Sequence, residues 1–454
     1  MQIKEDFMQR ISSRFKYAGL FSSVFLSLSV AGVANPSSLL GPRISGNTAG
    51  QVVAIWSEFD EGCFVVKQAE LPFGGSWGDG LQVSPTGQNC MYPDIDINAG
   101  GKILSGWKNA DDNEGASMQV CFDNFGTDEE PTLATTSFYA GPPVSGYFPD
   151  IELSNGGKGV LLWQGSGSSG YMLLATGCSE EDLRTPIVYL SSGTSYMPDP
   201  DFVMNLETGT GLALWIATVG SNKAVVAGSV SLAGVRTGPV LLSTEGTNAG
   251  SPTVVFNSAG DAFGAWVIKT QPYFALEATS LSDTLVASPT TLSMSGASLM
   301  HPRIAANAAG QVLLVAEAQT GITASQIVTA LQGATSGWGP FQTLSASATL
   351  QAKAPEVALN ESGQGVAIWV DRTSGQGVIQ VAQYSSGEWG DPIPLSSTQY
   401  NSGVPMVYLH DSGYAVVSWL SLDTQSTETN TFLIQSACLP SMTGTWGSAQ
   451  TLSP

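Results

Sequence analysis

The chain has few positively charged residues. It contains 16 Lys and Arg against 37 Asp and Glu, which gives a formal net charge of −21 at pH 7. This balance argues against nucleic acid and anionic membrane surfaces as partners, because both attract basic patches. Charged residues of all kinds make up only 12% of the chain, while Ser, Thr, Gly and Ala are abundant. Such a composition is typical of an extracellular β-protein and not of a disordered chain.

Long apolar runs are also missing, except near the N-terminus. Residues Met1–Ala34 combine a basic start with an apolar stretch from Ala18 to Ala31, and they end in small residues. This pattern predicts a secretory signal peptide with cleavage before Asn35. The apolar stretch is short for a membrane span, and we expect no transmembrane segment elsewhere. We therefore expect an exported protein that resides in the periplasm, on the cell surface or outside the cell.

Cysteine is scarce. The five cysteines are Cys63, Cys90, Cys121, Cys178 and Cys438, and no two have the C-x-x-C spacing of a zinc or redox motif. An odd number allows at most two internal disulfides in an exported chain. Cys63 and Cys90 fall in segments that should meet on one face of the fold, which makes them a possible pair. Cys121 occupies a column in which other parts of the chain have alanine, so we expect a small core residue there.

The chain also contains a unit of about 50 residues that occurs eight times. Each unit opens with a proline, and the eight prolines are Pro42, Pro93, Pro149, Pro200, Pro252, Pro302, Pro355 and Pro405. Five residues later comes asparagine in six units (Asn47, Asn98, Asn205, Asn257, Asn307, Asn360), and three residues after that position comes glycine in seven. Fourteen or fifteen residues after the proline comes tryptophan in seven units (Trp56, Trp107, Trp163, Trp215, Trp266, Trp369, Trp419). A repeat of this length is one supersecondary unit that buries its apolar face only against its neighbours.

Each unit predicts four antiparallel strands. In the sixth unit these run from Pro302 to Asn307, from Gln311 to Ala318, from about Ser325 to Leu331, and through a short segment ending at Ser345. Asn followed by Gly at the fourth position favours a type I turn between the first two strands. The prediction is an all-β, eight-bladed β-propeller that fills residues 35–454 as one domain, after the signal peptide of residues 1–34. A β-helix or open array is the alternative fold. We expect the tryptophans to be core residues, because burying an indole of roughly 200 Å² stabilises by about 5 kcal/mol.

The pattern P-x-[IV]-x-x-N-x-x-G-x-x-x-x-x-W resembles the repeats of exported bacterial β-propeller proteins, which implies the same architecture. Two other propeller families match less well. The Asp box of sialidases, S-x-D-x-G-x-x-W, has no counterpart, because the aspartate is missing and the glycine and tryptophan are six residues apart. The Gly-Gly doublet of Kelch repeats does not recur. The active residues of neither family carry over to this chain.

The residue after each repeat-opening proline is charged in six of the eight units. These residues are Arg43, Asp94, Asp150, Asp201, Thr253, Arg303, Glu356 and Met406. If the proline-led strand is innermost, they form a ring near one mouth of the central channel. Asp94, Asp150 and Asp201 come from three consecutive units and provide the oxygen ligands that Ca²⁺ prefers, so a calcium site is one hypothesis. The other hypothesis, which we favour, is that Arg43 pairs with Asp94 and Arg303 with Glu356 while the remaining acids face water; no cofactor is then expected.

Binding is the function that the loops favour. Connections between the second and third strands and between successive units vary in length, whereas the Asn-x-x-Gly turns at the opposite end are uniform. Variable loops on a rigid scaffold usually carry binding sites. Four tyrosines lie in equivalent connections, and tyrosine gives contact area at low entropic expense; they are Tyr92, Tyr147, Tyr196 and Tyr400. We expect a monomeric binding or scaffolding propeller with a protein or carbohydrate partner.

Catalytic motifs are weak. There are two histidines, His301 beside a repeat-opening proline and His410 in a turn position that other units give to asparagine. No G-x-S-x-G elbow, H-E-x-x-H motif, Walker loop or dinucleotide fingerprint is present. A propeller glycosidase or lyase that uses the carboxylates at the mouth is one alternative function, and a structural protein of the cell envelope is another. The enzyme hypothesis predicts two or more desolvated carboxylates with opposed pKa shifts.

Overall fold

The computed structural model describes residues 40–60, 62–110, 117–126, 132–138, 145–167, 170–180, 187–194, 200–232, 236–281, 285, 287–321, 323–346, 351–423 and 432–453. At residues 40, 117, 132–138, 145–148, 166–167, 192–194 and 236 it describes the backbone only. The predicted signal peptide lies outside these ranges.

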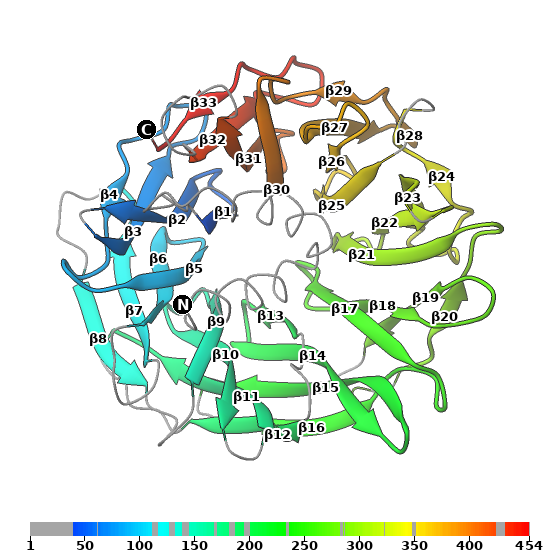
Figure 1. Ribbon diagram of the computed structural model, residues 1–454, viewed down its shortest axis with the longest axis horizontal. Coiled ribbons are helices and arrows are strands. Elements are labelled where there is room, and N and C mark those ends of the chain that lie inside the picture. The colour runs from blue at the N-terminus through cyan, green and yellow to red at the C-terminus, as the bar shows by residue number, and fades with distance from the viewer. Residues whose placement is uncertain are drawn as a thin grey trace, which may run out of the picture.

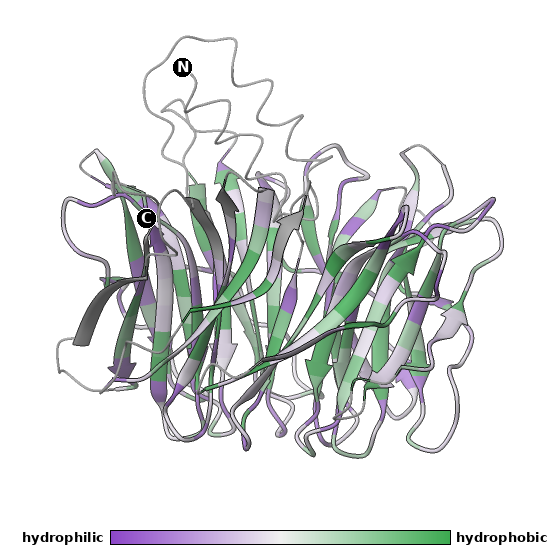
Figure 2. Cartoon of the chain, turned by 90° about the horizontal axis from the view of Figure 1, so that it is seen from below, coloured by the Kyte–Doolittle hydropathy of each residue, from purple (hydrophilic) through white to green (hydrophobic). Residues whose placement is uncertain are grey.

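Eight antiparallel sheets surround one axis, and each sheet is built from a single continuous segment of the chain (Figure 1). The first strand of every sheet lies innermost and contacts the first strands of both neighbouring sheets. The predicted eight-bladed β-propeller with four-stranded blades is therefore confirmed, and the proline-led strand is the innermost one. Seen from the side, the strands run between two faces of the ring (Figure 2).

The strands of the first four blades are as follows. Blade one has β1 (Leu40–Gly46), β2 (Val52–Asp60), β3 (Cys63–Leu71) and β4 (Leu81–Gln82). Blade two has β5 (Cys90–Ile97), β6 (Lys102–Asn109), β7 (Ser117–Asn124) and β8 (Thr132–Phe138). Blade three has β9 (Ser145–Leu153), β10 (Gly159–Gly167), β11 (Gly170–Cys178) and β12 (Val188–Thr194). Blade four has β13 (Asp201–Asn205), β14 (Thr210–Val219), β15 (Asn222–Ser231) and β16 (Arg236–Leu241).

The other four blades repeat this order. Blade five has β17 (Ala249–Phe256), β18 (Ala262–Ile268), β19 (Ala275–Leu281) and β20 (Thr290–Leu292). Blade six has β21 (Ser298–Ala306), β22 (Val312–Gln319), β23 (Ser325–Gln332) and β24 (Gln342–Thr343). Blade seven has β25 (Ala352–Leu359), β26 (Gly365–Asp371), β27 (Val378–Ser385), β28 (Glu388–Trp389) and β29 (Ile393–Pro394), and the two short strands both pair with β27. Blade eight has β30 (Tyr400–Leu409), β31 (Ala415–Asp423), β32 (Phe432–Leu439) and β33 (Gln450–Thr451).

In every blade except blade four, the inner strand begins earlier than the sequence predicts, because the chain passes the proline in a β-bulge. In blade six the register shifts between Met300 and Arg303, so that His301 and Pro302 form the bulge. The residue before the proline has a left-handed backbone in five blades: Tyr92, Ser251, His301, Ala354 and Val404 have φ between 49° and 58°. A bulge leaves one residue unpaired. The missing N–H of proline therefore breaks no ladder bond, and the strand continues past it.

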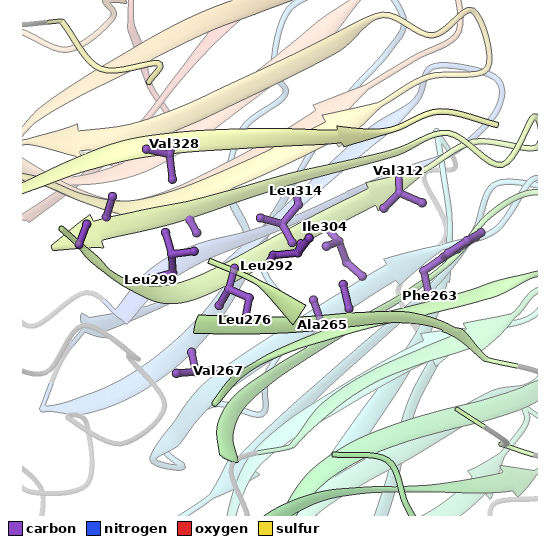
Figure 3. Close-up of a cluster of buried hydrophobic side chains, with 14 residues drawn as sticks. Phe263, Ala265, Val267, Leu276, Leu292, Leu299, Ile304, Val312, Leu314 and Val328 are labelled. Atoms are coloured by element: carbon purple, nitrogen blue, oxygen red, sulfur yellow. The ribbon is translucent and has the colours of Figure 1, made fainter. Parts of the chain in front are cut away.

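Tryptophan holds the core as predicted. All seven tryptophans of the first column are at most 1% exposed. Each packs towards the preceding blade; Trp266 of blade five, for example, joins a cluster with Leu212 and Leu214 of blade four. The boundary between blades five and six shows the same packing with smaller residues, and in it Phe263 and Leu276 face Leu299 and Ile304 (Figure 3).

The asparagine of the turn forms the predicted turn and also bonds to the next blade. In blade six the Gly310 N–H donates to the Asn307 carbonyl at 2.9 Å, which is the expected turn bond. The Asn307 side chain is fully buried, and its Nδ2 donates to the Asn360 carbonyl of blade seven at 3.4 Å. Equivalent bonds join blades one and two (3.0 Å), two and three (3.1 Å), five and six (3.0 Å) and seven and eight (3.2 Å). A belt of side-chain amides thus ties the blades together on the turn face.

Within the described ranges, the ring closes without exchange of a strand between the first and the last blade. Trp56 of blade one packs with Leu420, Phe432 and Ile434 of blade eight. His410 occupies the turn position as expected, and its Nε2 lies 3.1 Å from the Thr48 carbonyl of blade one. Since the Ser412 N–H donates to Nδ1 at 3.1 Å, the imidazole donates from Nε2. Side chains alone therefore seal the seam.

All five cysteines have free thiols, so Cys63 and Cys90 do not form the possible pair. Cys121 is 1% exposed, as expected for a core residue, and burial raises the pKa of its thiol to about 12. Within the described parts of the chain, no helix is long and apolar enough to span a membrane.

Candidate functional site

The predicted ring of residues after the prolines lines the inner wall. Asp94, Asp150 and Asp201 are half-buried on three consecutive inner strands. The Asp94 carboxylate accepts a hydrogen bond from the Ile151 N–H of the next blade at 2.9 Å, and that of Asp201 accepts from the Val254 N–H at 2.7 Å. The carboxylates therefore bind the open edge of the neighbouring inner strand, whose N–H groups have no ladder partner.

A second row of acids repeats this arrangement two residues further along. Asp96 accepts from the Leu153 N–H of blade three at 2.8 Å, and Glu152 accepts from the Met204 N–H of blade four. Ser45 of blade one also donates to Asp96, at 2.6 Å. These acids join the first four blades through the backbone of the following strand.

The acids of this second row hold their protons more tightly than usual. Loss of hydration raises the pKa of Asp96 from 3.8 to about 6, although three hydrogen bonds to its carboxylate oppose the rise. Loss of hydration also raises the pKa of Glu152 well above its ordinary value, and the nearby charges of Asp96, Asp150 and Asp94 raise it further. Both shifts go upward, so Asp96 and Glu152 do not show the opposed shifts expected of a general acid and its partner.

The hypothesis of a calcium site at the three aspartates remains a prediction. Asp94, Asp150 and Asp201 supply oxygen ligands, but one oxygen of Asp94 and one of Asp201 already accept a backbone N–H. Among the residues that the structure describes, no three His, Cys, Asp or Glu side chains converge in a metal-binding group.

Two arginines of the inner wall form ion pairs with acids of the next blade. The Arg303 Nε lies 2.9 Å from Glu356 Oε1, across the boundary between blades six and seven. The Arg43 Nε lies 3.8 Å from Asp94 Oδ1, across the boundary between blades one and two. Both ion pairs that the sequence predicts are therefore present, and the first has the shorter contact.

A third ionic group, which was not predicted from the sequence, lies close to the Arg303 pair. Glu317 of β22 is fully buried, and its carboxylate lies 2.9 Å from Lys353 Nζ and 3.2 Å from His301 Nδ1. It also accepts the Ala354 N–H at 3.0 Å. Burial alone would raise the pKa of Glu317, but His301 and Lys353 outweigh it and leave this pKa below the ordinary value. The signal in the sequence was that repeat six alone has alanine, Ala316, in the tryptophan column, followed directly by an acid.

The predicted tyrosines do not form one exposed aromatic surface. Tyr92 is only 8% exposed and fills the space beside its proline. Tyr400 is half-buried at the start of β30. The Tyr147 side chain and the whole of Tyr196 lie outside the described residues. A different tyrosine, Tyr273, is 44% exposed in the connection from β18 to β19.

The connection that carries Tyr273 is tied to its surroundings. The Lys269 N–H donates to the Asn248 carbonyl at 2.8 Å, and the Phe274 N–H donates to Ser298 Oγ at 3.1 Å. The Thr270 hydroxyl donates to the carbonyl of Tyr273 itself. These bonds place the exposed ring beside the start of β21, the strand that carries His301, on the face with the variable connections. We call this the loop-rich face, and we call the opposite face with the Asn-x-x-Gly turns the turn face.

Comparison with known proteins gives the fold alone. No family model and no curated protein sequence matches the chain. Among solved structures, the β-propeller domain of the Trilobed protease from Pyrococcus furiosus is 8% identical over 81% of this chain and 98% of that chain, with a TM-score of 0.45. An ulvan lyase of polysaccharide lyase family PL25 is 9% identical over 84% and 89%, with a TM-score of 0.46. A protein of unknown function from Dyadobacter fermentans is 12% identical over 77% and 94%, with a TM-score of 0.42.

Proposed function

We propose that the protein is an exported, non-catalytic binding propeller that holds a carbohydrate partner on its loop-rich face. The observation that carries this proposal is the exposed ring of Tyr273, presented by a connection that hydrogen bonds fix in place. A fixed aromatic ring provides contact area without the entropy loss of ordering a mobile loop. Export rests on the predicted signal peptide.

The hydrogen bonds of the inner-wall acids favour binding over hydrolysis. A glycosidase needs two carboxyl groups that face one bound sugar. Asp94, Asp96 and Asp201 instead direct an oxygen at the backbone of the next blade. They maintain the ring, and the loop-rich face remains available for a ligand.

The test is an immobilised-glycan array probed with the mature protein and two variants. Tyr273→Ala removes a side chain that is 44% exposed on the loop-rich face, and Leu206→Ala removes one that is 43% exposed on the turn face. We expect Tyr273→Ala to lower glycan binding at least tenfold, on the scale of about 1.4 kcal/mol for one stacking ring, and Leu206→Ala to leave it unchanged. Equal binding by both variants would contradict the proposal, and capture of a protein ligand in place of glycans would assign the face to a protein partner.

A further inference from the structure

The group formed by Glu317, Lys353 and His301 departs from the repeat at each of its three positions. The residue before the repeat-opening proline is histidine only in blade six, and lysine occurs two residues before the proline only in blade seven. The position of Glu317 is held by Ser57, Lys108, Gln164, Ile216, Val267, Val370 and Leu420 in the other blades. Structural duties in a repeat protein recur from blade to blade, as the amide belt does. Glu317 contacts both His301 and Lys353, and all three depart from the repeat. The group therefore indicates a role that is specific to the boundary between blades six and seven.

The three side chains differ in their access to water. The Glu317 side chain is 0% exposed, whereas those of Lys353 and His301 are 17% and 18% exposed. The acid is thus enclosed and its two partners reach the surface. An ordinary surface ion pair exposes both charges, as Lys67 and Glu58 do at 21% and 18%.

Three groups approach the two oxygens of the Glu317 carboxylate. His301 Nδ1 and the Ala354 N–H both approach Oε1, while Lys353 Nζ approaches Oε2. An ammonium group has three N–H donors. Lys353 can therefore direct a donor at a ligand while it still bonds to Glu317, and His301 continues to hold the acid in place.

The surroundings favour an anionic sugar as that ligand. Val315 pairs with Arg303, and Glu317 lies two residues along β22, so Arg303 and Glu317 are on the same side of the blade six sheet. The exposed ring of Tyr273 lies on the connection that is hydrogen-bonded to the start of this same β21 strand. Tyr273 and Lys353 thus present an exposed aromatic ring and a cationic donor at the loop-rich end of blades five to seven. Such a pair suits a carboxylate-bearing carbohydrate chain, in which one sugar ring stacks while the charge of another is bound.

We propose that Lys353, held by Glu317 and His301, binds the carboxylate of an acidic carbohydrate such as a uronic acid at the boundary of blades six and seven. This proposal rests on the proposed carbohydrate-binding function and names its ligand class. Lys353 is the contact residue. Glu317 and His301 are positioning residues.

The experiment measures binding of methyl β-D-glucuronide and of the neutral methyl β-D-glucoside by calorimetry at low salt, with tetraglutamate as an acidic peptide. We expect the wild type to prefer the glucuronide, Lys353→Met to weaken that binding about tenfold, and Lys353→Arg to retain it. Glu317→Gln keeps the shape of the acid but removes its charge, so it should strengthen glucuronide binding by roughly fivefold. A purely structural ion pair would give no such gain. The matched control Lys67→Met should change nothing.

Each outcome decides between the two proposals. Equal binding of both sugars that is insensitive to Lys353 would leave the carbohydrate-binding function standing and overturn the acidic ligand. Binding of tetraglutamate alone through Lys353 would overturn the sugar assignment. Absence of binding to either sugar and to the glycan array would overturn both proposals. A loss in Lys353→Met without a gain in Glu317→Gln would contradict direct contact between Lys353 and the ligand carboxylate, because the charge of Glu317 should oppose that contact. Urea unfolding of every variant shows whether a loss of binding follows from a loss of fold.

Discussion

The inner wall of the ring joins its blades by two different chemistries. In blades two to four the carboxylates of Asp94, Asp96 and Asp201 accept backbone N–H groups of the next inner strand. In blades six and seven the carboxylates of Glu317 and Glu356 are paired with cationic side chains. The backbone edge is the same in both regions. The difference shows that a carboxylate can join two blades through backbone N–H groups or through a cationic side chain. In the first region burial raises the pKa of Asp96, whereas in the second His301 and Lys353 leave the pKa of Glu317 below its ordinary value.

Removal of Lys353 should lower stability more than any other change. It takes a cationic partner away from Glu317, whose carboxylate has no access to water. We expect Lys353→Met to lower the free energy of unfolding by about 3 kcal/mol, measured by urea denaturation. Lys67→Met is the control, since Glu58 keeps water contact and the loss there should stay below about 1 kcal/mol. The double variant Lys353→Met/Glu317→Gln should recover most of the stability. Equal losses at the two lysines would show that burial of Glu317 adds nothing.

Loss of an asparagine from the amide belt should lower stability by the same amount in both regions, because these bonds lie on the turn face and do not involve the acids and cations of the inner wall. Asn98 bonds to the Ser154 carbonyl and Asn307 to the Asn360 carbonyl, and both side chains are buried. We expect Asn98→Ala and Asn307→Ala each to cost about 2 kcal/mol, since both leave a buried carbonyl without its donor. A difference above roughly 1 kcal/mol in thermal or urea unfolding would mean that the two regions also differ on the turn face.

The two regions should also differ in how their stability depends on pH, because the pKa of Asp96 is raised whereas that of Glu317 is lowered. The pKa of Asp96 is raised to about 6 from 3.8, so between these values the folded protein binds the proton more tightly than the unfolded chain does. The free energy of unfolding should therefore rise as the pH falls from about 7 to about 5. Glu152 contributes in the same direction, because its pKa is raised too, and we expect Asp96→Asn to remove about 1 to 2 kcal/mol of the gain. Glu207→Gln, on the turn face, should retain the gain. A gain of equal size in Asp96→Asn would assign it to other groups.

Loss of either arginine should lower stability by a smaller amount. The pair with the shorter and more buried contact should lose more. Arg303 is 20% exposed with a contact of 2.9 Å, whereas Arg43 is 37% exposed with a contact of 3.8 Å. We expect Arg303→Met to lower stability by about 1 kcal/mol and Arg43→Met by less than about 0.5 kcal/mol. Added salt should reduce both losses. The reverse order would show that distance and exposure do not rank these pairs.

Calcium should have the smallest effect. Because the acids of blades two to four already bind backbone N–H groups, we expect the melting temperature to be the same in EDTA and in added Ca²⁺. A rise of several degrees with Ca²⁺ that Asp94→Asn/Asp150→Asn abolishes would establish a cation site and remove the distinction between the two regions.

The architecture could be predicted from the sequence because it repeats. Proline, asparagine, glycine and tryptophan recur at fixed spacing, and each column has one structural reason. The turn at Asn307 and the buried Trp266 followed directly from those columns. The ion pairs of Arg43 and Arg303 were predicted as well, because they lie in equivalent positions of adjacent units.

The rest of the site could not be predicted, because it depends on contacts between blades. The bulge at His301 is a backbone conformation that no single residue type specifies. Because of it, β21 begins before the proline, at Ser298, and not at the proline itself. The partners of Asp94 and Asp96 are backbone N–H groups, which every residue except proline has. Glu317 and Lys353 lie in different repeats and in different columns, so their contact follows from no periodicity. The exposure of Tyr273 depends on hydrogen bonds made by its own connection.

The amide belt has a consequence for assembly. At five of the eight boundaries one blade provides a donor amide and the next blade provides the carbonyl of the same column, so the joint is a head-to-tail contact between unlike surfaces. Contacts of this kind continue until rotation brings the last unit back to the first. The number of blades is therefore set by the angle between neighbours and not by any complementary pair of ends. Because each blade is one uninterrupted segment, a whole unit could be duplicated or removed without leaving a strand unpaired.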